Sequence, residues 1–198
     1  MTQAFVNQGN NLLALGLLAQ GYAPEHVMSE LEANDPNHEF RQIAVIDRMG
    51  RIAAYSGPKN RGWAGHVTGD GYVAMGNVLA GKPVVDAMAA AYEGATDLSF
   101  ERRLLAAIEA GRDAGGQVGN DGHLPERSAA VMVYGDYDHA ELDLRVDLHD
   151  KAVEELRRAF EQYELYRGYY KQRARNPKDA IPQYAFAQSL SRKPEAAR

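Results

Sequence analysis

Apolar residues recur at helical spacing in five stretches of the chain, and each stretch predicts a helix. The first, Asn11 to Gln20, is rich in leucine and alanine and is expected to be a buried helix that ends at Gly21, because glycine commonly stops helices. The second begins at Pro24, since proline suits the first helical position. The other three are expected to begin at Pro83, at Asp97 or Ser99, and at Asp150.

Extended apolar runs between these helices predict strands. The expected strands are Thr2 to Val6, Gln42 to Asp47, Arg51 to Ser56, Ala64 to Thr68, Tyr72 to Asn77, Ser128 to Tyr134 and Leu142 to Val146. The glycine-rich stretch from Gly111 to Gly122 is expected to be a loop. Strands and helices do not alternate regularly, so the pattern favours an α/β (α+β) fold in which helices cover antiparallel sheets.

The length of 198 residues suits one domain, predicted over residues 1–170, followed by a polar extension or arm over 171–198. A net charge of −5 argues against a nucleic-acid-binding protein. The chain has no cysteine, which excludes disulfides and thiolate zinc sites. It shows neither a signal peptide nor an apolar run long enough for a membrane span, so a cytoplasmic protein that does not bind membranes is expected.

The segment from Gly65 to Gly81, GHVTGDGYVAMGNVLAG, is distinctive. Together with Val84–Met88, Arg127–Ala130 and Asp143–His149 it resembles the family called domain of unknown function 1028, in consistent order from Thr2 to about Tyr166. The resemblance implies an Ntn-hydrolase-like (N-terminal nucleophile) fold, in which two antiparallel sheets are sandwiched between helical layers. Some relatives carry a peptidoglycan-binding module, so the implied activity is hydrolysis of amide bonds, including those of peptidoglycan.

Members of that family usually open with further strands before the segment that matches Thr2 to Phe5. This chain is therefore expected to lack the first strands of the family and to leave a sheet edge that something must cover.

Three residues are the candidate catalytic groups. Thr2 could act as an N-terminal nucleophile with its own amine as the base once Met1 is removed, although the corresponding threonine of the resembling family is internal. His66 could be a general base, and Asn77 could donate to a developing oxyanion. The alternatives are that Thr2 is an ordinary strand residue, His66 a surface residue, and Asn77 part of a turn.

A second group of residues is expected to contact substrate. Trp63 could stack on a sugar or acyl group, although packing is the alternative for a lone tryptophan. Asp147 and His149 are two positions apart on an expected strand and would face the same side. Asp143 and Arg145 would share that face, so an ion-pair network is the alternative to a binding site.

The expected function is that of an uncharacterised protein that hydrolyses amide bonds in a small-molecule or peptide-like substrate, without cofactor or bound metal. The alternative is a non-catalytic binding or assembly protein on the same fold. Tyrosine suits interfaces, and five tyrosines gather near the C-terminus, which favours a homo-oligomer. These are Tyr163, Tyr166, Tyr169, Tyr170 and Tyr184.

Overall fold

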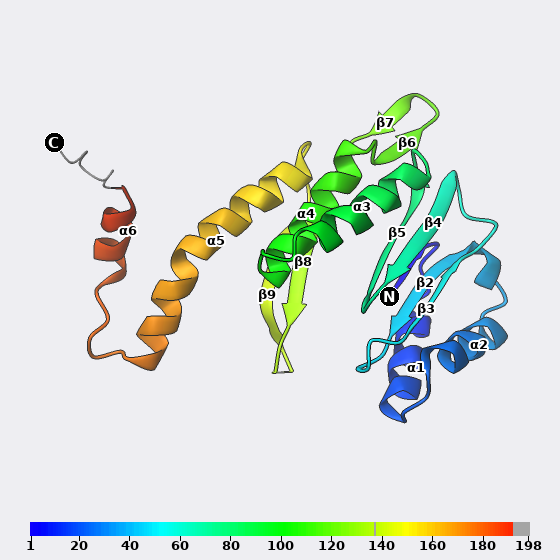
Figure 1. The fold of residues 1–198 in the computed structure, drawn as a ribbon, viewed down its shortest axis with the longest axis horizontal. Helices are drawn as coiled ribbons and strands as arrows, with labels where there is room; N and C mark the ends of the chain where they lie inside the picture. The colour runs from blue at the N-terminus through cyan, green and yellow to red at the C-terminus, as the bar shows by residue number, and fades with distance from the viewer. Residues whose placement is uncertain (137, 192–198) are drawn as a thin grey trace.

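The computed structural model describes residues 1–136 and 138–191, which form helices and three antiparallel sheets (Figure 1). The mixed α/β architecture predicted from the sequence is confirmed. The first sheet has the strand order β1-β2-β3, the second β4-β5-β6-β7, and the third contains β8 and β9. The strands are β1 (Thr2–Ala4), β2 (Arg41–Ile46), β3 (Ile52–Ser56), β4 (Trp63–Gly69), β5 (Tyr72–Leu79), β6 (Gln117–Gly119), β7 (Gly122–Leu124), β8 (Ala129–Tyr134) and β9 (Ala140–Val146).

Helices α1 to α3 lie on the outer faces of the first two sheets, α4 and α5 lie beside the third, and α6 lies beyond the sheets, near the far end of α5 (Figure 1). They are α1 (Gln8–Ala19), α2 (Pro24–Asn34), α3 (Lys82–Gly94), α4 (Phe100–Asp113), α5 (Ala152–Arg175) and α6 (Gln183–Ser191), with a short 3-10 helix at His38–Phe40. None of these helices is both long enough and apolar enough to cross a membrane, within the part of the chain that the structure describes.

Four layers follow one another from α1 to α4. Helices α1 and α2 pack on the first sheet through a buried cluster of Val27, Leu31, Ile43 and Val45. The opposite face of the first sheet contacts the second sheet, and α3 packs on the outer face of β4 and β5. The hairpin between β2 and β3 is closed by Gly50, whose φ of 77° lies in the left-handed region that glycine adopts freely. The residues between the two sheets are thus enclosed by α1 and α2 on one side and by α3 on the other.

A separate core joins α4, the third sheet and α5. It is built around Leu105, Val131, Leu142, Leu156 and Phe160. Its strands present alternate residues to the helices, as expected for a sheet with one covered face. Beyond this core, α5 continues and α6 folds back beside its far end (Figure 1).

The predicted buried helix after Asn11 is a helix, but it is not buried. Leu12 and Leu15 of α1 are 75% and 63% exposed, whereas Leu13 and Leu17 pack against the first core. Leucine and alanine occur on all sides of this helix, but only one side packs on the sheet. The apolar residues on the other side remain exposed.

The ends of several predicted elements were wrong. Helix α5 begins at Ala152, and Lys151 rather than Asp150 is its N-cap residue. The expected loop from Gly111 to Gly122 contains the end of α4 and the hairpin strand β6, because short strands next to glycines leave little periodic signal. Within the predicted C-terminal extension or arm, residues 171–191 contain the end of α5 and helix α6.

Candidate functional site

The contact between the first and second sheets is organised by Gln42, which is 0% exposed. Its Nε2 lies 2.8 Å from Ser56 Oγ, 3.0 Å from the carbonyl oxygen of Gly65 and 2.9 Å from that of Gly76, so its two hydrogens are shared among three acceptors. Its Oε1 accepts a hydrogen bond of 2.7 Å from Gln3. One buried amide therefore joins β1, β3, β4 and β5.

Ser56 and His66 meet at the edge of this network. Ser56 ends β3, His66 lies in β4, and the distance from Ser56 Oγ to His66 Nδ1 is 2.9 Å. Because Gln42 donates to the same oxygen, the Ser56 hydroxyl is placed to donate its own proton to His66. His66 is exposed to solvent. The pair has the arrangement of a nucleophile beside a general base.

Gly57 follows Ser56 and fixes the backbone at the end of β3. Its N–H donates to the carbonyl of Arg41 at 2.9 Å. A Cβ at this position would lie 2.2 Å from the carbonyl oxygen of Glu39, a contact that the backbone cannot accept. Only glycine lets the strand approach this closely.

Asn77 belongs to the same network. Its Nδ2 lies 3.3 Å from Oε1 of Gln42, and its carbonyl oxygen accepts a hydrogen bond from Gln117. The next residue, Val78, has a φ of 57°, an unfavourable value for a β-branched residue, at an irregularity in the pairing of β4 with β5. The structure thus links Asn77 to His66 through Gln42 and Ser56; their roles in catalysis stay a prediction.

Thr2 lies on the other side of the first sheet. It pairs with Ile43, which faces α1 and α2, whereas Gln3 shares the face of Gln42. Thr2 is 8% exposed, and its hydroxyl oxygen makes no hydrogen bond. The amine of Met1 donates to the carbonyl of Ala44, and burial lowers the pKa of this amine. The structure does not bring Thr2 together with His66 and Asn77.

Trp63 contributes to a core. It packs against the cluster of Leu79, Val84 and Val85 beneath α3, and its indole ring covers Gly65, where a Cβ would lie 2.4 Å from the ring. His66 faces Ser56 on the side of the first sheet.

The remaining predicted substrate residues lie in or after β9, on the third sheet. Asp143 and Arg145 occupy its exposed face, with 3.8 Å between the Asp143 carboxylate and Arg145 Nε. Strand β9 ends at Val146, so Asp147 and His149 are not on a strand as expected. The N–H of His149 donates to the carbonyl of Arg127, and its Nδ1 accepts from the N–H of Lys151. Among residues 1–136 and 138–191, no three His, Asp or Glu side chains gather as metal ligands would.

Two members of the network were not predicted from the sequence. The sequence predicts only that Ser56 and Gln42 belong to strands, because neither residue lies in a recognisable catalytic motif. The signal that was available is positional: Gln42 is a polar residue within an apolar strand, and such a residue must find a hydrogen-bonding partner.

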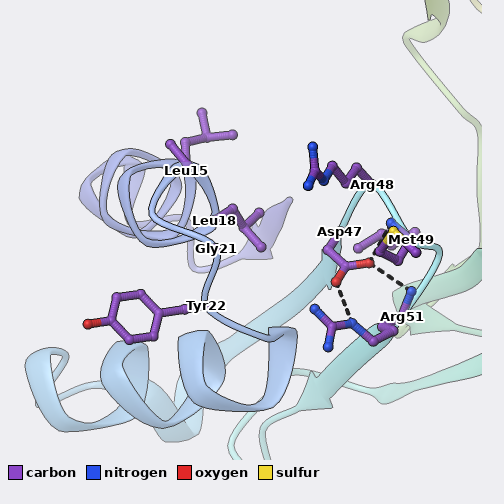
Figure 2. Close-up of a pocket in the computed structure, with 10 residues that line it drawn as sticks. Leu15, Leu18, Gly21, Tyr22, Asp47, Arg48, Met49 and Arg51 are labelled. Atoms are coloured by element: carbon purple, nitrogen blue, oxygen red, sulfur yellow. Dashed lines mark hydrogen bonds and ion pairs between the residues drawn. The ribbon is translucent and has the colours of Figure 1, made fainter.

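A shallow cavity of about 390 Å³ lies elsewhere, between α1 and the turn from β2 to β3 (Figure 2). Leu18 points toward this turn, while the ring of Tyr22 points away from it. Asp47 accepts hydrogen bonds from the N–H groups of Met49 and Arg51 and from Arg51 Nε, so its carboxylate is used in holding the turn.

The comparisons with known proteins agree with this architecture. The crystal structure of protein SPO2555 from Silicibacter pomeroyi, also assigned to DUF1028, superposes with a TM-score of 0.69 at 30% sequence identity. The similarity covers 79% of this chain and 67% of that one. None of the curated proteins compared matches the chain. The model of the family of unknown function DUF1028 matches residues 1–156, and the chain belongs to this family.

Proposed function

We propose that the protein hydrolyses acyl bonds, esters or amides, with Ser56 as the nucleophile and His66 as the general base. The observation that carries this proposal is the 2.9 Å contact between Ser56 Oγ and His66 Nδ1 on an accessible imidazole. The proposal retains the hydrolysis of amide bonds expected from the family resemblance, but it assigns the nucleophile to Ser56 instead of Thr2. Thr2 lies on the opposite face of the first sheet from His66.

In the proposed reaction, Ser56 Oγ attacks the acyl carbon while its proton passes to His66 Nδ1. The protonated imidazole then donates this proton to the leaving oxygen or nitrogen as the bond to the acyl carbon breaks. Water, deprotonated by the same imidazole, releases the acyl group and restores the serine. Gln42 is a positioning residue, since it donates to Ser56 Oγ and is itself fixed by Gln3.

Asn77 is the candidate oxyanion donor in this scheme. Its Nδ2 is engaged by Gln42 across 3.3 Å, a long and therefore weak hydrogen bond that a developing oxyanion could displace. A side-chain donor of this kind supplies about 10²- to 10³-fold in rate.

The test uses a fluorophosphonate, which reacts with activated serines, followed by peptide mapping and by an assay with p-nitrophenyl acetate. The unmodified protein and the Ser29→Ala control, altered on the surface of α2, are expected to react at Ser56. Ser56→Ala should abolish labelling and turnover, and His66→Gln should reduce both by about 10²-fold or more. Circular dichroism verifies that the variants fold. Labelling at another residue, or none, would overturn the proposal.

Peptidoglycan stem peptides are the first amide substrates to examine once Ser56 is shown to react. A small-molecule or peptide-like substrate suits a serine at the solvent-accessible edge of two sheets. Turnover of p-nitrophenyl acetate without cleavage of any amide would restrict the activity to esters.

The second candidate function is that of a binding or assembly protein. It is favoured by an apolar cavity of about 530 Å³ that lies away from Ser56, between β5 and β8. If Ser56 is unreactive, this cavity remains as the functional feature of the fold.

A further inference from the structure

The charges of the chain are unevenly distributed. Residues 1–164 hold 25 acidic and 14 basic side chains, whereas residues 165–198 hold eight basic and two acidic ones. The family model ends at residue 156, so the basic segment lies outside the part that matches the family. A molecule with separate acidic and basic regions is electrostatically complementary to a second copy of itself.

The end of α5 and the residues that follow it carry four exposed cations, here called the basic tip. They are Lys171, Arg173, Arg175 and Lys178. Arg167, earlier on α5, is paired with Glu101 and Glu164, but none of the four forms an ion pair within the part of the chain that the structure describes. Cations at the end of a helix favour its dipole, but Lys178 lies beyond the end of α5, so the dipole does not account for the whole group.

Helix α5 holds the basic tip away from the sheets of its own chain (Figure 1). Tyr163 packs against the core of the third sheet, and Arg175 lies about 18 Å farther along the helix axis. The tip is flanked in the sequence by large apolar side chains that are 41–69% exposed, namely Leu165, Tyr170, Ile181, Tyr184 and Leu190. Tyrosine and arginine are enriched at protein interfaces, so this composition indicates a protein partner.

The connection from β8 to β9 carries the opposite charge. Asp136, Asp138 and Glu141, here called the acidic turn, are exposed and form no ion pair among the described residues. The hydroxyl of Tyr163 lies 3.5 Å from the carbonyl oxygen of Glu141, so α5 passes this turn before it leaves the sheet. In Figure 1 the acidic turn and the end of α5 both point toward the bottom of the view. The two charged regions therefore lie on the same side of the molecule.

We propose that two copies of the chain form a dimer in which the basic tip of each copy binds the acidic turn of the other. Two-fold symmetry makes both contacts at once, because the same surface of each copy then forms the interface. The exposed tyrosines beside the tip supply apolar area to this interface. A polyanion such as a nucleic acid fits less well, because the acidic remainder of the chain repels it. The proposal does not depend on the reactivity of Ser56.

The test measures the dissociation constant of the dimer by analytical ultracentrifugation of the full chain. We expect a dimer in about 50 mM sodium chloride, with a dissociation constant that rises at least tenfold in about 500 mM, because salt screens charges at a surface.

Two charge-reversed variants identify the partners in the interface. The tip variant combines Lys171→Glu, Arg173→Glu and Arg175→Glu, and the turn variant combines Asp136→Lys, Asp138→Lys and Glu141→Lys. Each variant alone should dissociate at least tenfold more readily, because like charges then face each other. An equimolar mixture of the two should associate again, because opposite charges meet at both contacts of the mixed dimer.

A third variant controls for the change in net charge. It combines Arg48→Glu, Lys82→Glu and Arg127→Glu, three exposed positions outside both regions, and should dimerise as the unmodified chain does. Circular dichroism and urea unfolding first verify that all variants fold.

Four outcomes overturn the proposal. An unmodified chain that stays monomeric at low salt has no such interface, and a dimer that the tip variant retains has its interface elsewhere. Failure of the mixture to associate would show that the basic tip does not meet the acidic turn. A monomer that binds a single-stranded oligonucleotide, and loses this binding in the tip variant, would assign the basic tip to a polyanion.

Discussion

Asp35 fixes the junction of β1, α1 and β2 through its two carboxylate oxygens. They accept from both Nε and Nη2 of Arg41, at 2.9 and 3.1 Å, and from the side chains of Asn7 and Asn10. Arg41 also donates to the carbonyl of Phe5. Arg41, followed by the two asparagines and the N–H of Asn37, holds the pKa of the Asp35 carboxyl well below its usual range despite burial.

Replacement of Asp35 by Asn should lower the free energy of unfolding by about 3 kcal/mol at pH 7, because it leaves Arg41 without its carboxylate. A carboxyl with a lowered folded-state pKa stabilises the fold above its unfolded pKa of about 3.9, and this stabilisation is lost as the pH falls through the folded-state value. The difference between the two proteins should therefore shrink below about pH 4.

Urea unfolding at pH 7, 4 and 2.5 measures this difference, with Asp121→Asn in an exposed turn as the control. An equal loss for Asp35→Asn at all three pH values would contradict the assignment of the charge as the stabilising feature.

Gly57→Ala should lower the free energy of unfolding by about 2 kcal/mol, because the added methyl meets backbone atoms of Glu39 and Arg41 that cannot move alone. Gly16 is the matched control: a Cβ there meets no atom within 4 Å, so Gly16→Ala should instead stabilise α1 by about 0.5–1 kcal/mol. Thermal unfolding of both variants gives the comparison. Equal shifts would show that the contact at Gly57 relaxes.

At the residue scale, the sequence pointed to His66 and Asn77 but not to the pair with Ser56. Glycine-rich surroundings marked the first two, whereas Ser56 is the last residue of an ordinary strand. Its meeting with His66 depends on how two separate sheets are stacked, and no local pattern records that distance.

Helix α5 contains two parts with different roles. Phe160 is buried in the core with β8, β9 and α4, whereas Tyr169, farther along, stacks on Phe186 of α6 with 4.4 Å between ring centroids. The hydroxyl of Tyr169 donates to the carbonyl of Ile181. The second part of α5 thus has its own small contact surface with α6.

Phe160→Ala should therefore lower the free energy of unfolding by about 3–5 kcal/mol, as expected for a large cavity in a core. Phe186→Ala should barely affect global unfolding but should speed hydrogen exchange in α6, because its ring stacks on Tyr169 and meets Tyr166 edge-on, outside the main core. Circular dichroism and hydrogen exchange distinguish the two results. A similar loss of global stability for both would show that α6 belongs to the main cooperative unit.

The sequence located most long elements, because apolar spacing is strong in α2, β2, β5, α3 and β8. It missed β6, β7 and α6, which have three, three and nine residues and are too short to give a clear periodic signal. The predicted homo-oligomer also stays a prediction: Tyr169 is occupied by α6, but Tyr184 is 69% exposed, and light scattering on Tyr184→Ala would test its part in an interface.

At the scale of the whole molecule, the buried residues fall into separate cores. The clusters around Ile43 and Val85 lie in the layered part, and the cluster around Phe160 lies between α4, the third sheet and α5. The two parts meet mainly through the packing of α3 on α4, beside the apolar cavity between β5 and β8. The sequence predicted layered antiparallel sheets, but the division of strands among three sheets depends on long-range pairing that periodicity does not reveal.

Native-state hydrogen exchange should accordingly resolve two groups of amides in the isolated chain, one from β2 to β5 and one from β8 to α5, with different free energies of opening. Identical values would show that the packing of α3 on α4 couples the two parts into one cooperative unit.

Gln42 also has a mechanical consequence. It bonds to carbonyl oxygens of both β4 and β5 from within the first sheet, so the two sheets cannot slide past each other without breaking these bonds together. A force that pulls the chain along the strands would load them in parallel, and Gln42→Leu should lower the force at which the layers shear. The same resistance to sliding keeps Ser56 and His66 in register.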